Sequence, residues 1–405
     1  MMGLALRNLS RHRKRTAIAL LTIGIGVIAL LLAGGFIDWI FWGMRESTIQ
    51  SRLGHIQVTR PGYFQAGSAD PFAYLLPDRL LEQVNLEAVP EVNVVSPRLA
   101  FTGLISHGDV TIGFVGEGVD PGKDEDLSKY LKVIEGEGLS SDDPDGVFLG
   151  GGLARNLGVT VGDTVALLAT PASGGLNGVE GTVRGLFRSA SKDFDDAALR
   201  LPIDIARQLL RASGAHSWVV LLDKTENTES VLQQLQVQHP EETSRLQFTP
   251  WYTLAEFYQK TVKLFSRQMD IMRSIIALII VLSISNILIM SVLERTGEIG
   301  TLMAIGLKRR NIMFLFVSEG LMLGIIGGLL GAVTGTILAF AISAIGIPMP
   351  PPPGMEGGYT GEVLVTWPLV VGTLVLAVLT TLLGSLYPAW KASNMKVVDA
   401  LRYNR

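Results

Sequence analysis

The sequence has no cysteine among its 405 residues, and only 18% of those residues are charged. Without thiols the protein can form neither a disulfide nor a thiolate metal site. Basic and acidic residues nearly balance, and the net charge of -3 is too small to indicate a particular kind of partner. These shortages exclude several kinds of site without identifying one.

The motifs of common enzyme classes are missing too. The five histidines form no His-Glu-x-x-His pair, and there is no Gly-x-Ser-x-Gly turn to expose a nucleophile. The nearest approach to a phosphate-binding loop, at residues 118–124, has too few residues between its glycines and no Ser or Thr after Lys123. We therefore predict no catalytic residues, no metal ion and no cofactor bound by this chain. If energy is used, a partner chain supplies it.

Apolar residues make up 48% of the chain and gather in long runs. The predicted transmembrane helices are residues 16–44, 271–293, 311–347 and 364–386, each at least as long as the roughly 20 residues needed to cross a bilayer. The first run exceeds the roughly 7 to 15 apolar residues of a signal peptide, so we interpret it as a retained anchor. The predicted fold is a membrane protein with four transmembrane helices and a large α+β domain between the first and second.

Basic residues flank these runs on what would be one side of the membrane. They are Arg7, Arg11, Arg13, Lys14 and Arg15 before the first run, Lys308, Arg309 and Arg310 before the third, and Lys396, Arg402 and Arg405 at the end. Short segments rich in Lys and Arg stay in the cytoplasm. We therefore expect both termini inside and the large domain outside. Residues 1–15 suit a helix lying on the inner leaflet, or they simply fix the orientation.

Residues 45–268 have the composition of a soluble domain. Strands are predicted at 55–59, 92–96, 99–106, 110–115, 147–149, 164–169, 182–187 and 218–222, and helices at 77–89, 151–157, 202–212 and 228–238. Strands and helices do not alternate regularly, which favours an α+β domain over a doubly wound sheet. From about residue 251 an apolar stripe at helical spacing predicts a stalk helix that continues into the second span.

The segment 294–310 cannot lie in hydrocarbon, because it holds both acidic and basic side chains. Its pattern predicts a short amphipathic helix whose apolar patch is Ile299, Leu302, Met303 and Ile305. An apolar patch on a cytoplasmic loop indicates that this loop binds a protein partner.

The third span carries two glycine ladders, Gly320, Gly324 and Gly328 on one and Gly327, Gly331 and Gly335 on the other. Small residues at this spacing let helix backbones approach closely, within the chain or between two chains. Glu319 lies inside the cytoplasmic end of this span, where it needs a polar contact. We favour a contact with a cytoplasmic base over a proton or ion site. Residues 348–363 are predicted to form a stiff outer loop rich in Pro and Gly, and residues 387–405 a cytoplasmic tail.

Several of these stretches together resemble the permeases of the MacB, LolC/LolE and FtsX superfamily of ABC transporters. The most specific is the pattern of Glu294, Arg295, Glu298, Ile299, Gly300, Ala304 and Gly306, which resembles the cytoplasmic coupling segment of that family, so the resemblance implies that these residues make the contact with an ATPase. Next are the tail residues Pro388, Ala389, Lys391 and Ala392 with Ala400, Leu401 and Arg402. Further similarities are Arg7-Asn8-Leu9 and Arg15-Thr16, Glu319-Gly320, and in the large domain residues 116–121, 149–163 and 183–187. The resemblance covers nearly the whole chain. Its architecture is closer to LolC/LolE, because MacB carries a fused nucleotide-binding domain.

This resemblance implies a permease subunit in a bacterial inner membrane, with a periplasmic domain, that transmits motion driven by ATP. The implied partners are a dimer of ABC ATPases that bind ATP and Mg, a second permease that is either identical or a paralogue, membrane lipids, and a periplasmic carrier or adaptor. The implied cargo is a lipoprotein, a lipid or another amphiphile. Efflux of a toxin or peptide in the manner of MacB, and an FtsX-like scaffold for a cell-wall hydrolase, remain alternatives. No nucleic acid is implied.

Overall fold

The computed structural model describes residues 13–67, 69–129, 131–189, 192–241, 245–349 and 359–397. The predicted interfacial helix at 1–15 therefore lies almost wholly outside the described residues, as do residues 350–358 of the predicted outer loop and residues 398–405 of the tail. The chain divides into two compact units. We call residues 13–42, 261–349 and 359–397 the helical unit, and residues 43–260 the sheet domain.

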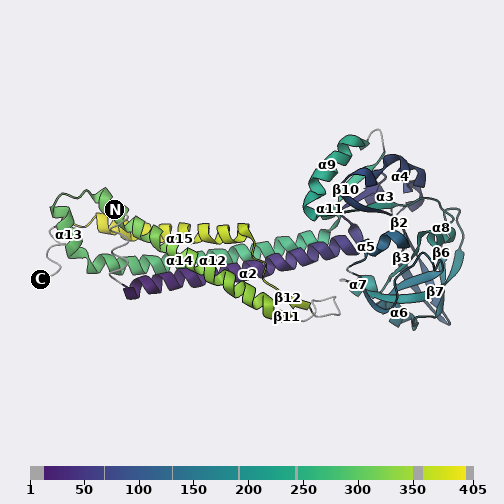
Figure 1. Cartoon of the computed structure of the whole chain (residues 1–405), viewed down its shortest axis with the longest axis horizontal. Coiled ribbons are helices and arrows are strands. Elements are labelled where there is room, and N and C mark those ends of the chain that lie inside the picture. Colours follow the sequence, from purple (N-terminus) through teal and green to yellow (C-terminus); the bar gives the residue numbers. More distant parts are fainter. Residues whose placement is uncertain are drawn as a thin grey trace. The chain divides into compact units, whose positions relative to one another are not determined.

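Within the described residues, four helices are long and apolar enough to cross a membrane (Figure 1). They are α2 (Arg13–Thr48), which passes into the π-helix η1 (Ile49–Leu53), α12 (Glu256–Glu294), α14 (Arg309–Ile345) and α15 (Trp367–Ser393). The large domain lies in the chain between the first and second of them. The predicted fold class is confirmed, because the apolar runs are helices and the insertion is a mixed α+β domain.

The helical unit is held together by apolar packing among all four helices. Its main buried cluster contains Ala19, Ile23 and Val27 of α2, Ile280, Ile284 and Leu288 of α12, Leu323 and Ala332 of α14, and Ala377 of α15. The buried hydroxyl groups of Thr373, Thr380, Thr381 and Ser385 donate hydrogen bonds to carbonyls of their own helix, α15. These polar atoms already have partners, so they do not need water inside the bundle. A short hairpin of β11 (Ile347–Met349) and β12 (Tyr359–Gly361) follows α14.

The sheet domain is built on one 10-stranded sheet (Figure 1). Its strands are β1 (Ile56–Thr59), β2 (Val92–His107), β3 (Val110–Val119), β4 (Lys132–Gly136), β5 (Gly146–Gly150), β6 (Thr164–Ala169), β7 (Asn177–Arg188), β8 (Ala198–Pro202), β9 (Ser217–Leu222) and β10 (Gln247–Pro250). The pairings close a ring, β2–β3–β8–β5–β7–β6 and back to β2. Strands β9, β1 and β10 extend the sheet from β2, and β4 extends it from β7.

The core of this domain is aliphatic and aromatic. Five completely buried residues come from four strands of the ring: Leu99 and Ile105 of β2, Leu149 of β5, Val183 of β7 and Leu199 of β8. The helices that accompany the sheet are α4 (Asp78–Val84), α5 (Pro121–Leu127), α6 (Gly151–Leu157), α8 (Ile203–Leu210), α9 (Thr228–Gln238) and the single turn α11 (Trp251–Leu254). Every strand and helix predicted in this domain falls on an observed element. The predicted strands at 92–96 and 99–106 are one strand, and β4, β8 and β10 were not predicted.

Candidate functional site

The predicted amphipathic segment forms the short helix α13 (Thr296–Ala304) between α12 and α14. Helix α12 ends at Glu294, and Arg295 has a non-helical backbone that lets the chain change direction. At the other end Gly306 adopts a φ of 101°, which a residue with a side chain rarely tolerates. The two breaks make α13 a separate element joined to α12 and α14 by tight turns.

One face of α13 packs against its own chain. Ile299 is only 3% exposed and Gly300 is buried. Ile299 packs in a cluster with Val292 of α12, Ile312 and Phe316 of α14, and Ala389 and Ala392 of α15, with Met303 packed at its edge. We call this cluster the base core. It joins α13 to the ends of α12, α14 and α15 that the sequence predicts to be cytoplasmic, near Val292, Ile312 and Ala389.

A partly buried arginine, Arg295, makes polar contacts at the same junction. The guanidinium of Arg295 donates one hydrogen bond to Glu298 and another to Glu319, each at 3.1 Å. It also lies 5.9 Å from the centre of the Phe316 ring, within the range of a cation–π contact. The Arg295 side chain is 12% exposed and that of Glu319 only 3%. Glu319 of α14 is therefore ion-paired with a base at the end of α12.

The opposite face of α13 is open. The Glu298 side chain is 51% exposed, Thr301 and Ala304 are exposed, and Ile305 is 78% exposed. The predicted apolar patch is thus divided. Ile299 packs in the base core, whereas Ile305, seven residues after the acidic Glu298, is exposed to solvent.

Glu294 takes part in a different ion pair from that of Arg295 and Glu319. Its carboxylate accepts a hydrogen bond from Arg15, near the start of α2. The pair links the first residues of α2 to the last residue of α12. Of the predicted contact residues, Arg295, Glu298, Ile299 and Gly300 therefore come together with Glu319 around the base core, Glu294 pairs with α2, and Ala304 and Gly306 lie on the exposed side.

Each glycine ladder of α14 packs against a different helix of the same chain. A Cβ on Gly320 or Gly324 would approach Ser385 or Thr381 of α15 closer than 3 Å. A Cβ on Gly331 would come within 2.8 Å of the Gly24 carbonyl oxygen of α2. Gly328 likewise faces α15, and Gly327 and Gly335 face α2. Both ladders are used for packing within the chain.

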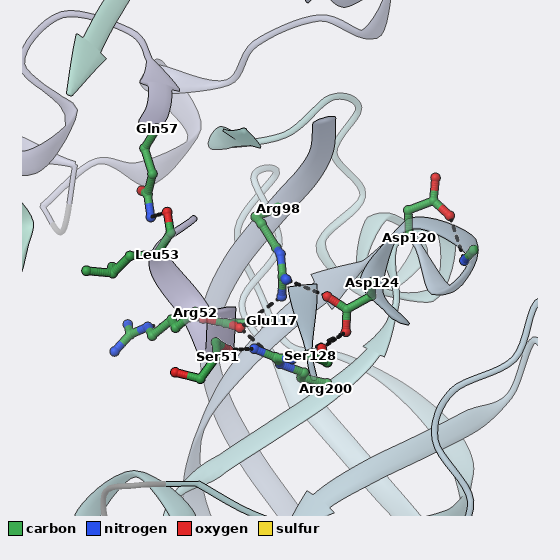
Figure 2. Close-up of polar contacts among 11 residues, drawn as sticks. Ser51, Arg52, Leu53, Gln57, Arg98, Glu117, Asp120, Asp124, Ser128 and Arg200 are labelled. Carbon is green, nitrogen blue, oxygen red and sulfur yellow. Dashed lines mark hydrogen bonds and ion pairs between the residues drawn. The ribbon is translucent and has the colours of Figure 1, made fainter. Parts of the chain in front are cut away.

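A second polar cluster, which the sequence did not reveal, lies in the sheet domain (Figure 2). Arg200 of β8 is completely buried and donates hydrogen bonds to Glu117 of β3 at 3.2 Å and to Asp124 of α5 at 3.3 Å. Arg98 of β2 pairs with the same two carboxylates. Ser128 bonds both Arg200 and Asp124. A single arginine inside the apolar strand 198–202 was the one local signal of this cluster.

Electrostatics in this cluster favour the charged forms of the two acids. Burial alone would raise the pKa of Glu117, but Arg200, Arg98 and the half-exposed Arg52 outweigh burial and hold it below its ordinary value. The pKa of Asp124 is lowered against burial in the same way, by Arg98 and Arg200. In the part of the chain that the structure describes, no group of three or more His, Asp or Glu could hold a metal ion.

Comparison with known proteins gives two family matches. Residues 16–238 match the MacB-like periplasmic core domain, and residues 271–397 match the C-terminal domain of FtsX-like permeases. The second match contains α13 and the base core.

Individual relatives agree with these matches. An uncharacterized ABC transporter permease of Methanocaldococcus jannaschii is 27% identical over 67% of this chain and 65% of its own length. The lipoprotein-releasing system transmembrane protein LolC of Haemophilus influenzae is 26% identical over 96% of this chain and 93% of its own. The macrolide export ATP-binding/permease protein MacB of Chromobacterium violaceum is 25% identical over 98% of this chain and 60% of its own. The chain thus spans about two thirds of the first of these relatives.

Proposed function

Because the chain belongs to the family of ABC transporter permeases with a MacB-like periplasmic core domain and an FtsX-like C-terminal domain, we propose that it couples ATP hydrolysis by a separate ATPase to work done by its sheet domain. The cargo is a lipoprotein, a lipid or another amphiphile, extracted or exported at the outer face of a bacterial inner membrane. The transported molecule does not pass through the bundle of this chain. This fits the buried hydroxyl groups of α15, which are satisfied by their own helix.

The observation that carries this proposal is the two-sided construction of α13. Its exposed side offers Glu298, Ala304 and Ile305 to a partner, and its buried side is fixed to α12, α14 and α15 through the base core. A partner that pushes on the exposed side therefore moves the ends of the long helices. In this family the partner is an ABC ATPase, and we place α13 in its surface groove.

The remaining assignments follow from that arrangement. ATP and Mg are bound by the ATPase dimer, and this chain binds no cofactor. Both termini and α13 are cytoplasmic, because Lys308, Arg309 and Arg310 lie at the start of α14 and Arg13, Lys14 and Arg15 begin α2. The sheet domain is periplasmic. A second permease, identical or a paralogue, completes the transporter, and a periplasmic carrier or adaptor receives the cargo.

The test uses two substitutions on the exposed side of α13 with a control elsewhere on the bundle. Glu298→Ala and Ile305→Asp should abolish stimulation of ATP hydrolysis by the permease and leave lipidated cargo in the inner membrane. Ile345→Asp, at the other end of α14 and 86% exposed, should do neither. Normal release of cargo by both α13 variants would contradict the proposal.

Efflux of a toxin or peptide is the second candidate, because the MacB relative matches this chain as fully as the LolC relative does. The two functions predict different phenotypes for the same variants. Loss of efflux makes cells sensitive to the exported compound and leaves lipoproteins in their normal membrane, whereas loss of lipoprotein release retains them in the inner membrane.

A further inference from the structure

The segment where α2 enters the sheet domain is attached to that domain by three separate sets of contacts. We call residues 45–53, the last turn of α2 and the π-helix η1, the junction segment. Its apolar side is Ile49, completely buried, and Leu53, which pack against Leu127 of α5 and Trp251 of α11. This cluster also includes Ala255 and Tyr258, so the beginning of α12 packs on the same core.

The backbone of the junction segment is unusual. The amide of Gly54 bonds the Ile49 carbonyl at 2.8 Å, a π-type turn that wraps the chain onto the sheet. A Cβ on Gly54 would lie 2.4 Å from Val219 and 2.9 Å from the Val220 carbonyl oxygen, so only glycine allows this approach to β9. Single π-turns of this kind are frequent at functional sites.

The second set of contacts comes from Arg200. Its guanidinium donates a hydrogen bond to the backbone carbonyl oxygen of Ser51 at 2.8 Å (Figure 2). The same guanidinium is held by Glu117, Asp124 and Ser128. The junction segment is therefore bonded to a side chain that is itself fixed by strands β3 and β8 and helix α5.

The third set is a chain of hydrogen bonds at the end of α2. Thr225 donates to Glu46 at 3.0 Å, and its oxygen lies 3.0 Å from Nε2 of His55. The backbone amide of Leu222 donates to Nδ1 of the same histidine at 2.9 Å. Because Nδ1 accepts, Nε2 carries the proton and donates to Thr225. The Leu222 amide of β9 thus donates to His55, His55 donates to Thr225, and Thr225 donates to Glu46 of α2.

Stability alone does not account for the buried arginine. Replacing a buried ion-pair network by apolar residues of similar size is often neutral or stabilising, because burial of charge is costly. Arg98 shares both carboxylates with Arg200, but it is Arg200 that also bonds Ser128 and the Ser51 carbonyl oxygen, and of these two bonds the one to Ser51 reaches the junction segment. An apolar side chain cannot make that bond.

We infer that Arg200 and Thr225 are positioning residues that hold the junction segment rigidly on the sheet domain. Movement of α2 is then transmitted directly to that domain. This role rests on the proposed function, since it requires movement that begins at α13. The residues touch no cargo. They act by holding the junction segment against β8 and β9.

The first experiment measures amide hydrogen exchange in the full chain. Arg200→Met should accelerate exchange of the amides of residues 49–54 at least tenfold. Arg98→Met, which disturbs the same two acids but has no bond to Ser51, should change it less than twofold. Equal acceleration in both variants would show a general stabilising network and overturn the inference, as would no change in either.

A milder pair of variants tests the other anchor and keeps the inference testable if Arg200→Met does not fold. Thr225→Val removes the hydroxyl group between His55 and Glu46 at nearly constant volume. Ser230→Ala removes a hydroxyl group in the following helix that bonds only Asn227. We expect faster exchange at residues 45–48 for the first variant only; unchanged exchange there would overturn the role of Thr225.

The transport role is tested with the permease reconstituted with its ATPase. The chain has no cysteine, so Val237→Cys on α9, 79% exposed, gives a unique site for a spin label. Arg200→Met should retain ATP hydrolysis and lose the ATP-dependent change of the label signal, and Arg98→Met should retain both. A wild-type amplitude in Arg200→Met would overturn the inference. No ATP-dependent signal even with Arg200 present would refute the proposed function instead, while the exchange data still decide whether the junction is rigid.

Discussion

The ion pair between Arg295 and Glu319 should stabilise the helical unit as a pair, so that removing one member costs more than removing both. Arg295 is 12% exposed and Glu319 is 3% exposed, and they meet at 3.1 Å. Breaking a buried pair by truncating one partner typically costs about 3–5 kcal/mol, and because part of Arg295 reaches solvent we expect about 3 kcal/mol for Arg295→Met. Replacing both residues by Met should leave stability within about 1 kcal/mol of the original.

The assay is reversible unfolding of the detergent-solubilised full chain by SDS, followed by helical circular dichroism. The two single variants and the double variant form a cycle whose coupling energy should be at least about 3 kcal/mol, because each single loss exceeds the loss in the double variant. Arg273→Met is the control on the same helix, because its pair with Asp270 is exposed and should contribute less than about 1 kcal/mol. If the double variant loses as much unfolding free energy as the two single variants together, Arg295 and Glu319 do not stabilise the unit as a pair, and this reasoning is refuted.

Two further predictions concern pH and helix packing. Burial lowers the pKa of both His55 and His216 to about 4. Between pH 6.5 and pH 4 the unfolded chain therefore binds more protons than the folded chain, so thermal stability should fall as the pH is lowered through this range. Above pH 6.5 the two histidines should make their full contribution to stability. The effect is on the order of 3 kcal/mol for each histidine, and a double His→Gln variant with the same slope as the original would contradict it. Gly331→Ala should destabilise the bundle by roughly 1–3 kcal/mol, because its Cβ would meet the backbone of Gly24 at 2.8 Å. Gly372→Ala, with no atom within 4 Å, should be neutral or gain up to about 1 kcal/mol; equal SDS unfolding of the two variants would disprove this explanation.

Local patterns were sufficient for most of the fold. Apolar runs identified the long helices, and the bounds of α6, α9 and β6 match the predictions. Pro97 suggested a break between two strands, yet β2 runs through it. Strand β3 pairs with β2 only from Arg98 onward, so Pro97 lies where β2 has β9 as its partner.

Other features of the sheet depend on residues far apart in the chain. Strand β8 was missed because its five residues include Arg200, and no local pattern reveals that Glu117 and Asp124 lie beside it. Closure of the ring through β6, which pairs with both β2 and β7, is likewise a long-range event. Sequence periodicity carries no information about such pairings.

The sequence predicted the short helix α13 but not the direction in which its apolar face lies. An amphipathic pattern shows that α13 has an apolar face, and it does not tell whether that face meets the same chain or another. The structure places Ile299 in the base core, buries Gly300 and leaves Ile305 exposed. The glycine ladders were equally ambiguous, because spacing alone fits packing within a chain or between two chains, and here α2 and α15 occupy them.

The most direct test of the account is cross-linking from Ile305 in intact cells. A photoreactive label on Ile305→Cys should form an adduct with an ABC ATPase and should resist a thiol reagent that cannot cross the membrane. Val237→Cys in the sheet domain should react with that reagent from outside and form no such adduct. Labelling of Ile305→Cys from outside, or an adduct with no nucleotide hydrolase, would contradict the claim that α13 is where the motor acts.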